Sequence, residues 1–203
     1  MNIWFATNNA HKKEELEAIL NIKLKIPSQE GLKFNPEETG DTFIENALIK
    51  AKELKKLLTN DEDIIISDDS GLCVDFLNGR PGVHSAYYGE TDGKKLTSEQ
   101  KNLLLLDELK DAANRKARFI CTMVLLFDMD RFYIIQETLE GEIVQCKGCM
   151  KGDGGFGYDP IFLLPQYDKT LAQLSSNEKN LVSHRGKAGK ILGEIIDKIK
   201  HRG

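Results

Sequence analysis

The sequence lacks both an apolar run long enough to cross a membrane and an excess of basic residues. Its 203 residues include 28 lysines and arginines against 32 aspartates and glutamates, which gives a formal net charge of −4. Binding along a nucleic acid usually needs a basic surface, so this balance disfavours a nucleic-acid or anionic-membrane partner. The N-terminal apolar stretch turns polar at Thr7 and is too short for a signal peptide. We therefore expect a cytoplasmic protein whose charge permits a small anionic ligand.

Cysteine is scarce as well. The four cysteines are Cys73, Cys121, Cys146 and Cys149. Only Cys146 and Cys149 are close in sequence, and a structural zinc site normally needs a second Cys or His pair. No such pair lies nearby, and His184 and His201 have the wrong spacing. We interpret Cys146 and Cys149 as a chance pair near a turn, in a protein whose cysteines are reduced.

What the chain does contain is typical of a globular α/β protein. Hydrophobic residues make up 40% and charged residues 30%, and short apolar runs alternate with segments of helical period. The length predicts a single domain over residues 1–203 that buries about 70% of its unfolded surface. The expected strands cover 3–6, 22–26, 64–66, 118–127, 132–140 and 142–146. The expected helices cover 11–20, 42–58 and 97–109, with a last one capped by Ser183.

Two acidic segments are candidates for metal binding. Asp68 and Asp69 follow the apolar run 64–66, and in open α/β sheets ligands bind at the ends of strands. Adjacent carboxylates repel each other, so a cation such as Mg2+ would offset their charge. Glu37 and Glu38 precede the long helix and offer a ligand from a second segment. The alternatives are a turn in which Asp and Ser cap local amides and ordinary acidic charge at a helix start.

Two further segments carry residues suited to a phosphorylated, planar ligand. Residues 7–12 lie between a strand and a helix, whose N-terminus attracts phosphate, although Asn9 is equally suited to cap that helix. The glycine-dense segment 152–157 formally matches G-x-G-x-x-G, but Pro160 follows where a helix should open, so we reject a dinucleotide site. Its glycines instead allow close backbone approach, with Phe156 or Tyr158 available to stack on a base. The alternative is a glycine hairpin loop with core aromatics.

The last expected helix carries basic residues at its N-terminus, where the helix dipole disfavours positive charge. His184 and Arg185 fall in the first turn of the last expected helix, at the positive end of its dipole. Together with Lys179 they provide donors that suit carbonyl acceptors on a ligand, unless the segment is a simple surface turn. Lys50, four residues after Asn46, faces either solvent or the same site as the acids.

Five motifs occur in the order and spacing of a known family. They are Ala6-Thr-Asn-Asn-Ala-His-Lys12, Glu38-Thr-Gly-Asp-Thr-Phe-Ile-Glu-Asn-Ala47, Ser67-Asp-Asp-Ser-Gly-Leu72, Gly154-Gly-Phe-Gly-Tyr-Asp-Pro160 and Ser183-His-Arg-Gly186. With them, nearly the whole chain resembles the inosine triphosphate pyrophosphatase family. The resemblance implies a two-lobed α/β fold on a long curved mixed sheet flanked by helices, with the active-site cleft between the lobes. It also implies hydrolysis of ITP, dITP and XTP to the monophosphate and pyrophosphate, dependence on Mg2+ with Mn2+ as a substitute, and a homodimer.

The resemblance assigns roles by motif position. It implies that Asp69 is the general base and a metal ligand, with Glu38, Glu37 and Asp68 as the other metal candidates. The implied triphosphate contacts are Thr7, Asn8, Asn9, Ala10, His11, Lys12, Lys50 and Ser70. The implied base pocket comprises Phe156, Gly157, Tyr158, Asp159, Lys179, His184 and Arg185. One position departs from the family, which often has Arg after Ser-Ala where this chain has Tyr87.

Two rival functions remain open at this stage. A Maf-like pyrophosphatase would act on pyrimidine or modified nucleotides, and the Gly-Gly-Phe-Gly-Tyr-Asp and Ser-His-Arg motifs argue against it. A non-catalytic nucleotide-binding module would have no use for three acids beside a phosphate. A nucleotide panel scored for pyrophosphate release, with and without EDTA, separates the three.

Overall fold

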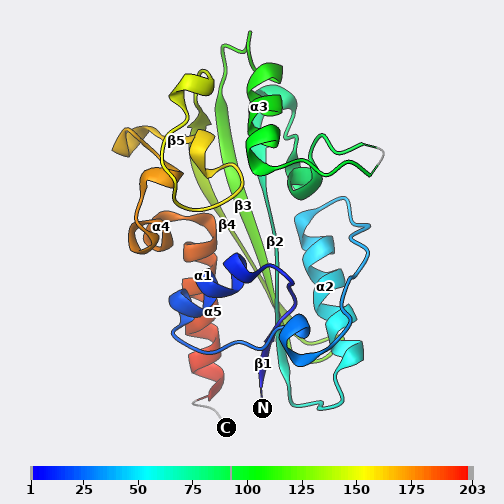
Figure 1. Ribbon diagram of the computed structural model, residues 1–203. Coiled ribbons are helices and arrows are strands. Elements are labelled where there is room, and N and C mark those ends of the chain that lie inside the picture. Colours follow the sequence, from blue (N-terminus) through cyan, green and yellow to red (C-terminus); the bar gives the residue numbers. More distant parts are fainter. Residues whose placement is uncertain (1, 92, 201–203) are drawn as a thin grey trace. The chain divides into compact units, whose positions relative to one another are not determined.

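The computed structural model describes residues 2–91 and 93–200. Its strands form a six-stranded sheet in the order β1-β2-β3-β4-β5-β6 (Figure 1). They are β1 (Ile3–Phe5), β2 (Ile64–Val74), β3 (Lys116–Leu126), β4 (Phe132–Ile143), β5 (Phe162–Leu164) and β6 (Lys169–Thr170). β1 runs parallel to β2, whereas β5 pairs antiparallel with β4 and β6, so the sheet is mixed. The helices are α1 (Ala10–Leu20), α2 (Phe43–Leu57), α3 (Ser98–Glu108), α4 (Ser176–Val182) and α5 (His184–Lys200). The α/β class with flanking helices is thus confirmed.

The chain divides into two compact units, which are described separately. Unit 1 comprises residues 1–69, 121–137 and 184–203, and unit 2 comprises residues 70–120 and 138–183. Strands β2, β3 and β4 each contribute residues to both units.

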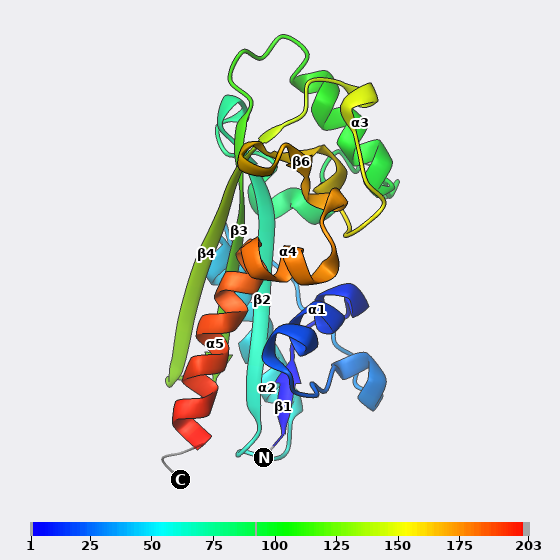
Figure 2. The same cartoon turned by 90° about the vertical axis from the view of Figure 1, so that its left-hand side faces the viewer.

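Unit 1 is built on strands whose side chains alternate between two apolar clusters. Ile64 and Ile66 belong to a cluster with residues of α1 and α5, such as Leu16 and Leu192. Ile65 lies in a second cluster that includes Ala47, Ala51 and Leu54 of α2. α1 and α5 therefore cover one face of these strands and α2 covers the other, as Figures 1 and 2 show. The two-residue period of a strand accounts for this division.

Unit 2 has a core of its own. Leu72 and Val74 of β2 pack there with α3 residues such as Leu105 and with Phe162 of β5. The start of α3 follows from its sequence, since Thr97 and Gln100 form the expected capping box. The same motif starts α2, where Thr42 accepts a hydrogen bond from the Glu45 amide. The helix α4 has no counterpart among the sequence predictions.

The strand expected over residues 22–26 is not formed. Within this segment, only Lys25 makes an isolated parallel bridge, to Trp4. Leu24 and Ile26 are still buried in the α1–α5 cluster, so the apolar alternation correctly predicts which side chains are buried. Pro27 then opens a 3-10 turn, and its missing N–H prevents further pairing.

Two strands run further than expected. β2 does not stop at Asp68 but continues through the Asp-Asp-Ser-Gly motif to Val74. β4 runs without a break to Ile143, so the separate short strand expected over 142–146 is wrong. In both places pairing with neighbouring strands outweighs the turn tendency of Asp, Ser and Gly.

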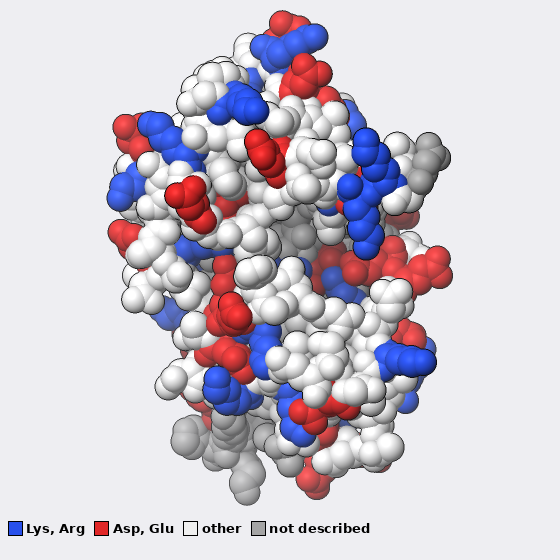
Figure 3. All heavy atoms as spheres, in the orientation of Figure 1, with Lys and Arg blue, Asp and Glu red and all other residues white. Residues whose placement is uncertain are grey.

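The surface agrees with the charge balance of the sequence. On the face drawn in Figure 3, acidic and basic side chains are interspersed. No helix within residues 2–91 and 93–200 has the length and apolar character needed to cross a membrane.

Candidate functional site

Because β2 continues through its acidic motif, Asp68 and Asp69 project from opposite faces of one strand. Asp68 has the same parity as Ile66 and meets residues of α1 and α5. Asp69 has the parity of Ile65 and meets α2, where its neighbour Ser67 also donates a hydrogen bond to the Ala47 carbonyl (2.6 Å). Two adjacent, chemically identical residues therefore occupy different environments.

Asp68 is the centre of a buried charge network. Its Oδ2 accepts hydrogen bonds from Arg185 Nε (3.0 Å) and the Cys121 thiol (3.3 Å), and its Oδ1 pairs with Lys12 Nζ. Although burial opposes ionisation, Arg185 and Lys12 hold the pKa of Asp68 well below its ordinary value. The same arginine donates from Nη1 to Glu15 Oε2 (2.8 Å). This network joins β2 to α1 and α5 and fixes the position of Lys12.

Asp69 is less completely satisfied. Its Oδ1 accepts a hydrogen bond from Lys50 Nζ (2.6 Å), which also contacts Glu38 Oε2 (3.2 Å). Its Oδ2 is buried and makes no hydrogen bond to the described residues. Burial raises the pKa of Asp69 to about 6, against the attraction of Lys50. Burial also acts on Lys50, but the carboxylates of Asp69 and Glu38 raise the pKa of this lysine.

The residues around Lys50 offer few metal ligands, which fits an ion such as Mg2+ that also binds water and substrate phosphates. They do not fit a metal whose ligands all come from the protein. Asp69 offers its unsatisfied Oδ2, and Glu38 shares the same lysine. Within the described part of the chain, no three His, Cys, Asp or Glu side chains converge as a metal site. Mg2+ is commonly held by one or two carboxylates together with water and substrate phosphates. Glu37 and Glu38 are both exposed, and of the two it is Glu38 whose carboxylate contacts Lys50. Both oxygens of Asp68 already contact donors.

The N-terminus of α1 is built as expected. Asn9 caps the helix, and its side chain accepts a hydrogen bond from the Lys12 amide (3.2 Å). Thr7 Oγ1 accepts from the Asn9 amide (3.1 Å), and Asn8 donates to the Phe34 carbonyl (2.7 Å). The first turn carries no acidic residue, so the positive end of this helix is not neutralised by its own side chains.

In unit 2 the glycine-dense loop is held by a second buried ion pair. Asp159 Oδ2 accepts from Lys179 Nζ (2.9 Å) and from the Phe156 amide (2.8 Å). Lys179 Nζ also lies 4.8 Å from the centre of the Phe156 ring, within the range of a cation–π contact. A side chain at Gly155 would collide with the Asp159 carboxylate. The loop thus brings a half-buried aromatic ring and a lysine together.

Two residues of this loop have structural roles. Tyr158 is buried in the unit 2 core, and its hydroxyl donates to the Ser85 carbonyl (2.9 Å). Gly157 accepts a hydrogen bond at its carbonyl from Asn102 of α3 (3.1 Å). The alternative interpretation of core aromatics therefore holds for Tyr158. Asn102 was missed in the sequence, where the only signal is a polar residue within a leucine-rich helix.

The predicted base-pocket residues fall into two groups. Phe156, Gly157, Tyr158, Asp159 and Lys179 belong to unit 2, whereas His184 and Arg185 begin α5 in unit 1. The surface-turn alternative does not describe His184 and Arg185, because both are buried. Glu15 and Cys121, which complete the Arg185–Asp68 network, carried no sequence signal.

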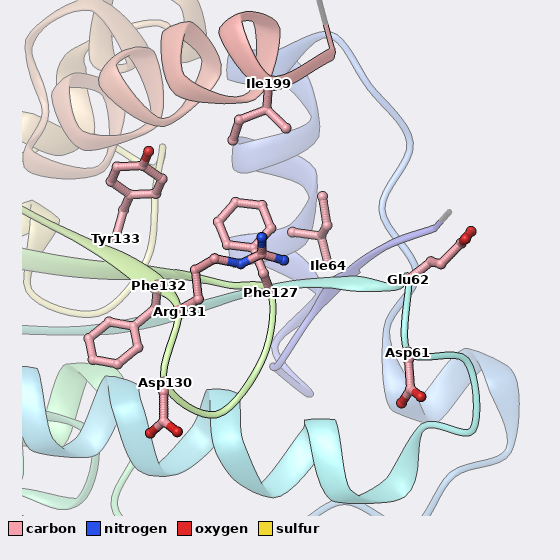
Figure 4. Close-up of a pocket in the computed structure, with 9 residues that line it drawn as sticks. All are labelled: Asp61, Glu62, Ile64, Phe127, Asp130, Arg131, Phe132, Tyr133 and Ile199. Atoms are coloured by element: carbon pink, nitrogen blue, oxygen red, sulfur yellow. The ribbon is translucent and has the colours of Figure 1, made fainter. Parts of the chain in front are cut away.

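A cavity of about 620 Å3 lies in unit 1, and none of the residues that line it is a predicted site residue (Figure 4). Phe127, Arg131 and Tyr133 of the β3–β4 hairpin line it together with Ile199 of α5. The Arg131 guanidinium stacks on the Phe127 ring at 5.2 Å, as Figure 4 shows. We therefore do not identify this cavity with the site that the motifs predict.

The N-terminus of α1 suggests a general class of protein. A helix N-terminus that follows a strand and carries a lysine in its first turn is a common phosphate-binding arrangement of α/β proteins. The acids Asp68 and Asp69 lie within β2 and not, as expected, beyond its end. The chain belongs to the Ham1 family, whose model matches residues 3–195.

Named relatives agree with this assignment. The chain is 49% identical to the dITP/XTP pyrophosphatase of Treponema denticola, over 93% of this chain and 94% of that protein. It is 41% identical to the dITP/XTP pyrophosphatase of Clostridium perfringens, over 96% and 95%. The structure of a HAM1 protein from Coxiella burnetii matches with a TM-score of 0.84 at 33% identity, over 98% of this chain and 99% of that one. The family resemblance seen in the sequence is confirmed.

Proposed function

We propose that this protein hydrolyses non-standard purine nucleoside triphosphates (ITP, dITP and XTP) to the monophosphate and pyrophosphate. Membership of the Ham1 family and near full-length relatives named dITP/XTP pyrophosphatase support the activity. The single structural observation that carries it is the buried Asp69 carboxylate, with one oxygen on Lys50 and the other unsatisfied.

Asp69 is the general base of the proposed reaction. In the metal-free protein its pKa of about 6 leaves it mostly ionised at neutral pH, and an ionised carboxylate can accept a proton from water as a general base. Asp69 and Glu38 are the proposed Mg2+ ligands, with Glu37 and Asp68 as the remaining candidates. The bound ion, Mg2+ or Mn2+, would supply charge neutralisation on the phosphate oxygens as the α–β bond breaks.

The other predicted residues near the α1 N-terminus and β2 are the proposed contacts of the triphosphate. The amides of residues 7–12 at the α1 N-terminus, together with Lys12, attract the anionic phosphates, and Lys50 and Ser70 are further contacts implied by the family. The ion pair with Asp68 holds the Lys12 ammonium group in position before the triphosphate binds.

Base recognition rests on donors that match a 6-oxo group. Hypoxanthine and xanthine present a carbonyl acceptor where adenine presents an amino donor, and such mispairing is worth on the order of 10⁴-fold. In unit 1 the proposed donors are His184 and Arg185. In unit 2 they are the loop amides of residues 156–159, where Phe156 and Lys179 offer a stacking surface. Guanine also has a 6-oxo group, so its exclusion depends on the amino group at its 2-position.

A nucleotide panel tests the proposal. We expect pyrophosphate, rather than orthophosphate, from ITP, dITP and XTP in the presence of Mg2+, and no release with EDTA. Asp69→Asn should lower turnover at least about 100-fold, whereas Asp130→Asn, on the exposed β3–β4 turn, is the matched control and should leave it unchanged. A preference for pyrimidine nucleotides would favour the Maf-like alternative, and binding without turnover would favour a non-catalytic module.

The cellular setting is proposed from the family resemblance alone. We place the protein in the cytoplasm as a homodimer that acts on free nucleotides, without a nucleic-acid or membrane partner. Sedimentation of the purified full chain tests the dimer directly.

A further inference from the structure

The proposed hydrolase activity makes no use of Cys146 and Cys149. Their Sγ atoms lie 2.9 Å apart, whereas the sulfurs of a disulfide are about 2.05 Å apart. The two atoms therefore need to approach by less than one ångström to bond. The 3-10 turn Lys147–Cys149 creates this proximity, since the Cys149 amide donates to the Cys146 carbonyl (3.0 Å). The turn expected from the sequence is real, but it brings the two thiols into contact.

The two thiols differ in a way that suits successive roles. Cys146 is exposed, whereas Cys149 is partly buried and packs against the unit 2 core. The hydrogen bond between the two thiols lowers the pKa of Cys146, helped by the backbone amides of Cys149 and Gly148 and by Arg115. The same hydrogen bond raises the pKa of Cys149. An accessible, more acidic thiol next to a protected one is the usual arrangement of an attacking and a resolving cysteine.

The cation beside this pair is held in place. Arg115 donates to the carbonyls of Ile143 (2.9 Å), Val144 (2.6 Å) and Leu109 (2.7 Å). These bonds hold the guanidinium at the end of β4, immediately before the cysteine turn.

A structural metal explains the pair less well. Zinc needs four ligands in a structural site, and in residues 2–91 and 93–200 no group of three His, Cys, Asp or Glu side chains is placed to bind a metal. The other two cysteines, Cys73 and Cys121, are buried and provide internal controls that a small reagent should not reach in the folded protein.

We propose that Cys146 and Cys149 form a reversible intramolecular disulfide by exchange with a small-molecule disulfide such as oxidised glutathione. The Cys146 thiolate attacks one glutathione sulfur, forms a mixed disulfide and releases one glutathione thiolate. Cys149 then loses its proton to solvent and attacks the Cys146 sulfur, which releases the second glutathione thiolate. Two protein thiols are oxidised to one disulfide, and one glutathione disulfide is reduced to two glutathione molecules.

The test is equilibration of the full chain with mixtures of oxidised and reduced glutathione, followed by acid quenching, alkylation in denaturant and peptide mass analysis. We expect Cys146 and Cys149 to lose alkylation together, with the loss of two hydrogen atoms, while Cys73 and Cys121 stay alkylated. Reduced glutathione in excess should restore both thiols. Failure of the pair to oxidise, or a disulfide that joins two chains instead, would overturn the proposal.

Two single variants test the division of roles. Cys149→Ser should trap a glutathione mixed disulfide on Cys146. In Cys146→Ser, the remaining Cys149 should react several-fold more slowly. Equal rates for the two variants would contradict the assignment of Cys146 as the attacking thiol. Because each readout is a mass, the result does not depend on whether the chain hydrolyses nucleotides.

Discussion

The raised pKa of Asp69 predicts a specific pH dependence of stability. An aspartate ordinarily titrates near 3.9, and burial moves Asp69 to about 6. A group whose pKa is higher in the folded state stabilises the protein only at low pH, and that contribution is lost as the pH rises through the folded pKa. The two pKa units correspond to at most about 3 kcal/mol. Replacing Asp69 by asparagine removes the titratable group, so the variant lacks this pH-dependent contribution.

We therefore expect the unfolding free energy of Asp69→Asn, relative to wild type, to rise by up to about 3 kcal/mol between about pH 4 and pH 7. Urea unfolding in EDTA, followed through the single buried tryptophan Trp4, measures both proteins. Asp130→Asn is the matched control and should stay within about 0.5 kcal/mol of wild type. Added Mg2+ should shrink the effect, because a nearby cation favours the carboxylate. A difference that does not change with pH would refute the burial argument.

Three further predictions follow from the ion pairs. Arg185→Met leaves Asp68 buried without its main partner and should cost about 3–5 kcal/mol of stability in urea unfolding, whereas the exposed Arg131→Met should cost about 1 kcal/mol or less. Lys50→Met removes the cation that opposes burial, so the acidic limb of kcat/KM against pH should move above about pH 6, and an unmoved limb would contradict the role of Lys50. Lys179→Met frees Asp159 and the glycine-dense loop, so KM for ITP should rise more than kcat falls, and the reverse pattern would place Lys179 at the chemical step.

Local signals in the sequence predicted the parts of the fold that depend on neighbours in the chain. The capping residues Thr42 and Thr97 locate the starts of α2 and α3, and the continuous apolar run at residues 64–66 correctly predicts a buried strand. The same local reading ended that strand too early, because its continuation to Val74 depends on pairing with distant strands.

For the candidate site, too, the sequence predicts some features and misses others. The motifs identified its residues, but not their partners. The Arg185–Asp68 pair joins residues 117 positions apart, and neither residue carries a sign of the other. The sequence predicts Lys179 as a donor to a ligand, and the structure pairs it with Asp159 of the glycine-dense loop.

The alternation along β2 has a consequence for engineering and for natural variation in this chain. Asp68 and Asp69 are the same amino acid one peptide bond apart, yet the strand assigns one to holding helices together and the other to the proposed chemistry. Inserting or deleting a single residue between Ile66 and Asp68 would move each carboxylate to the opposite face of the strand without altering either side chain. The role of each carboxylate thus depends on the face of β2 on which it projects. An alignment with a relative that is shifted by one residue here would give each aspartate the role of the other.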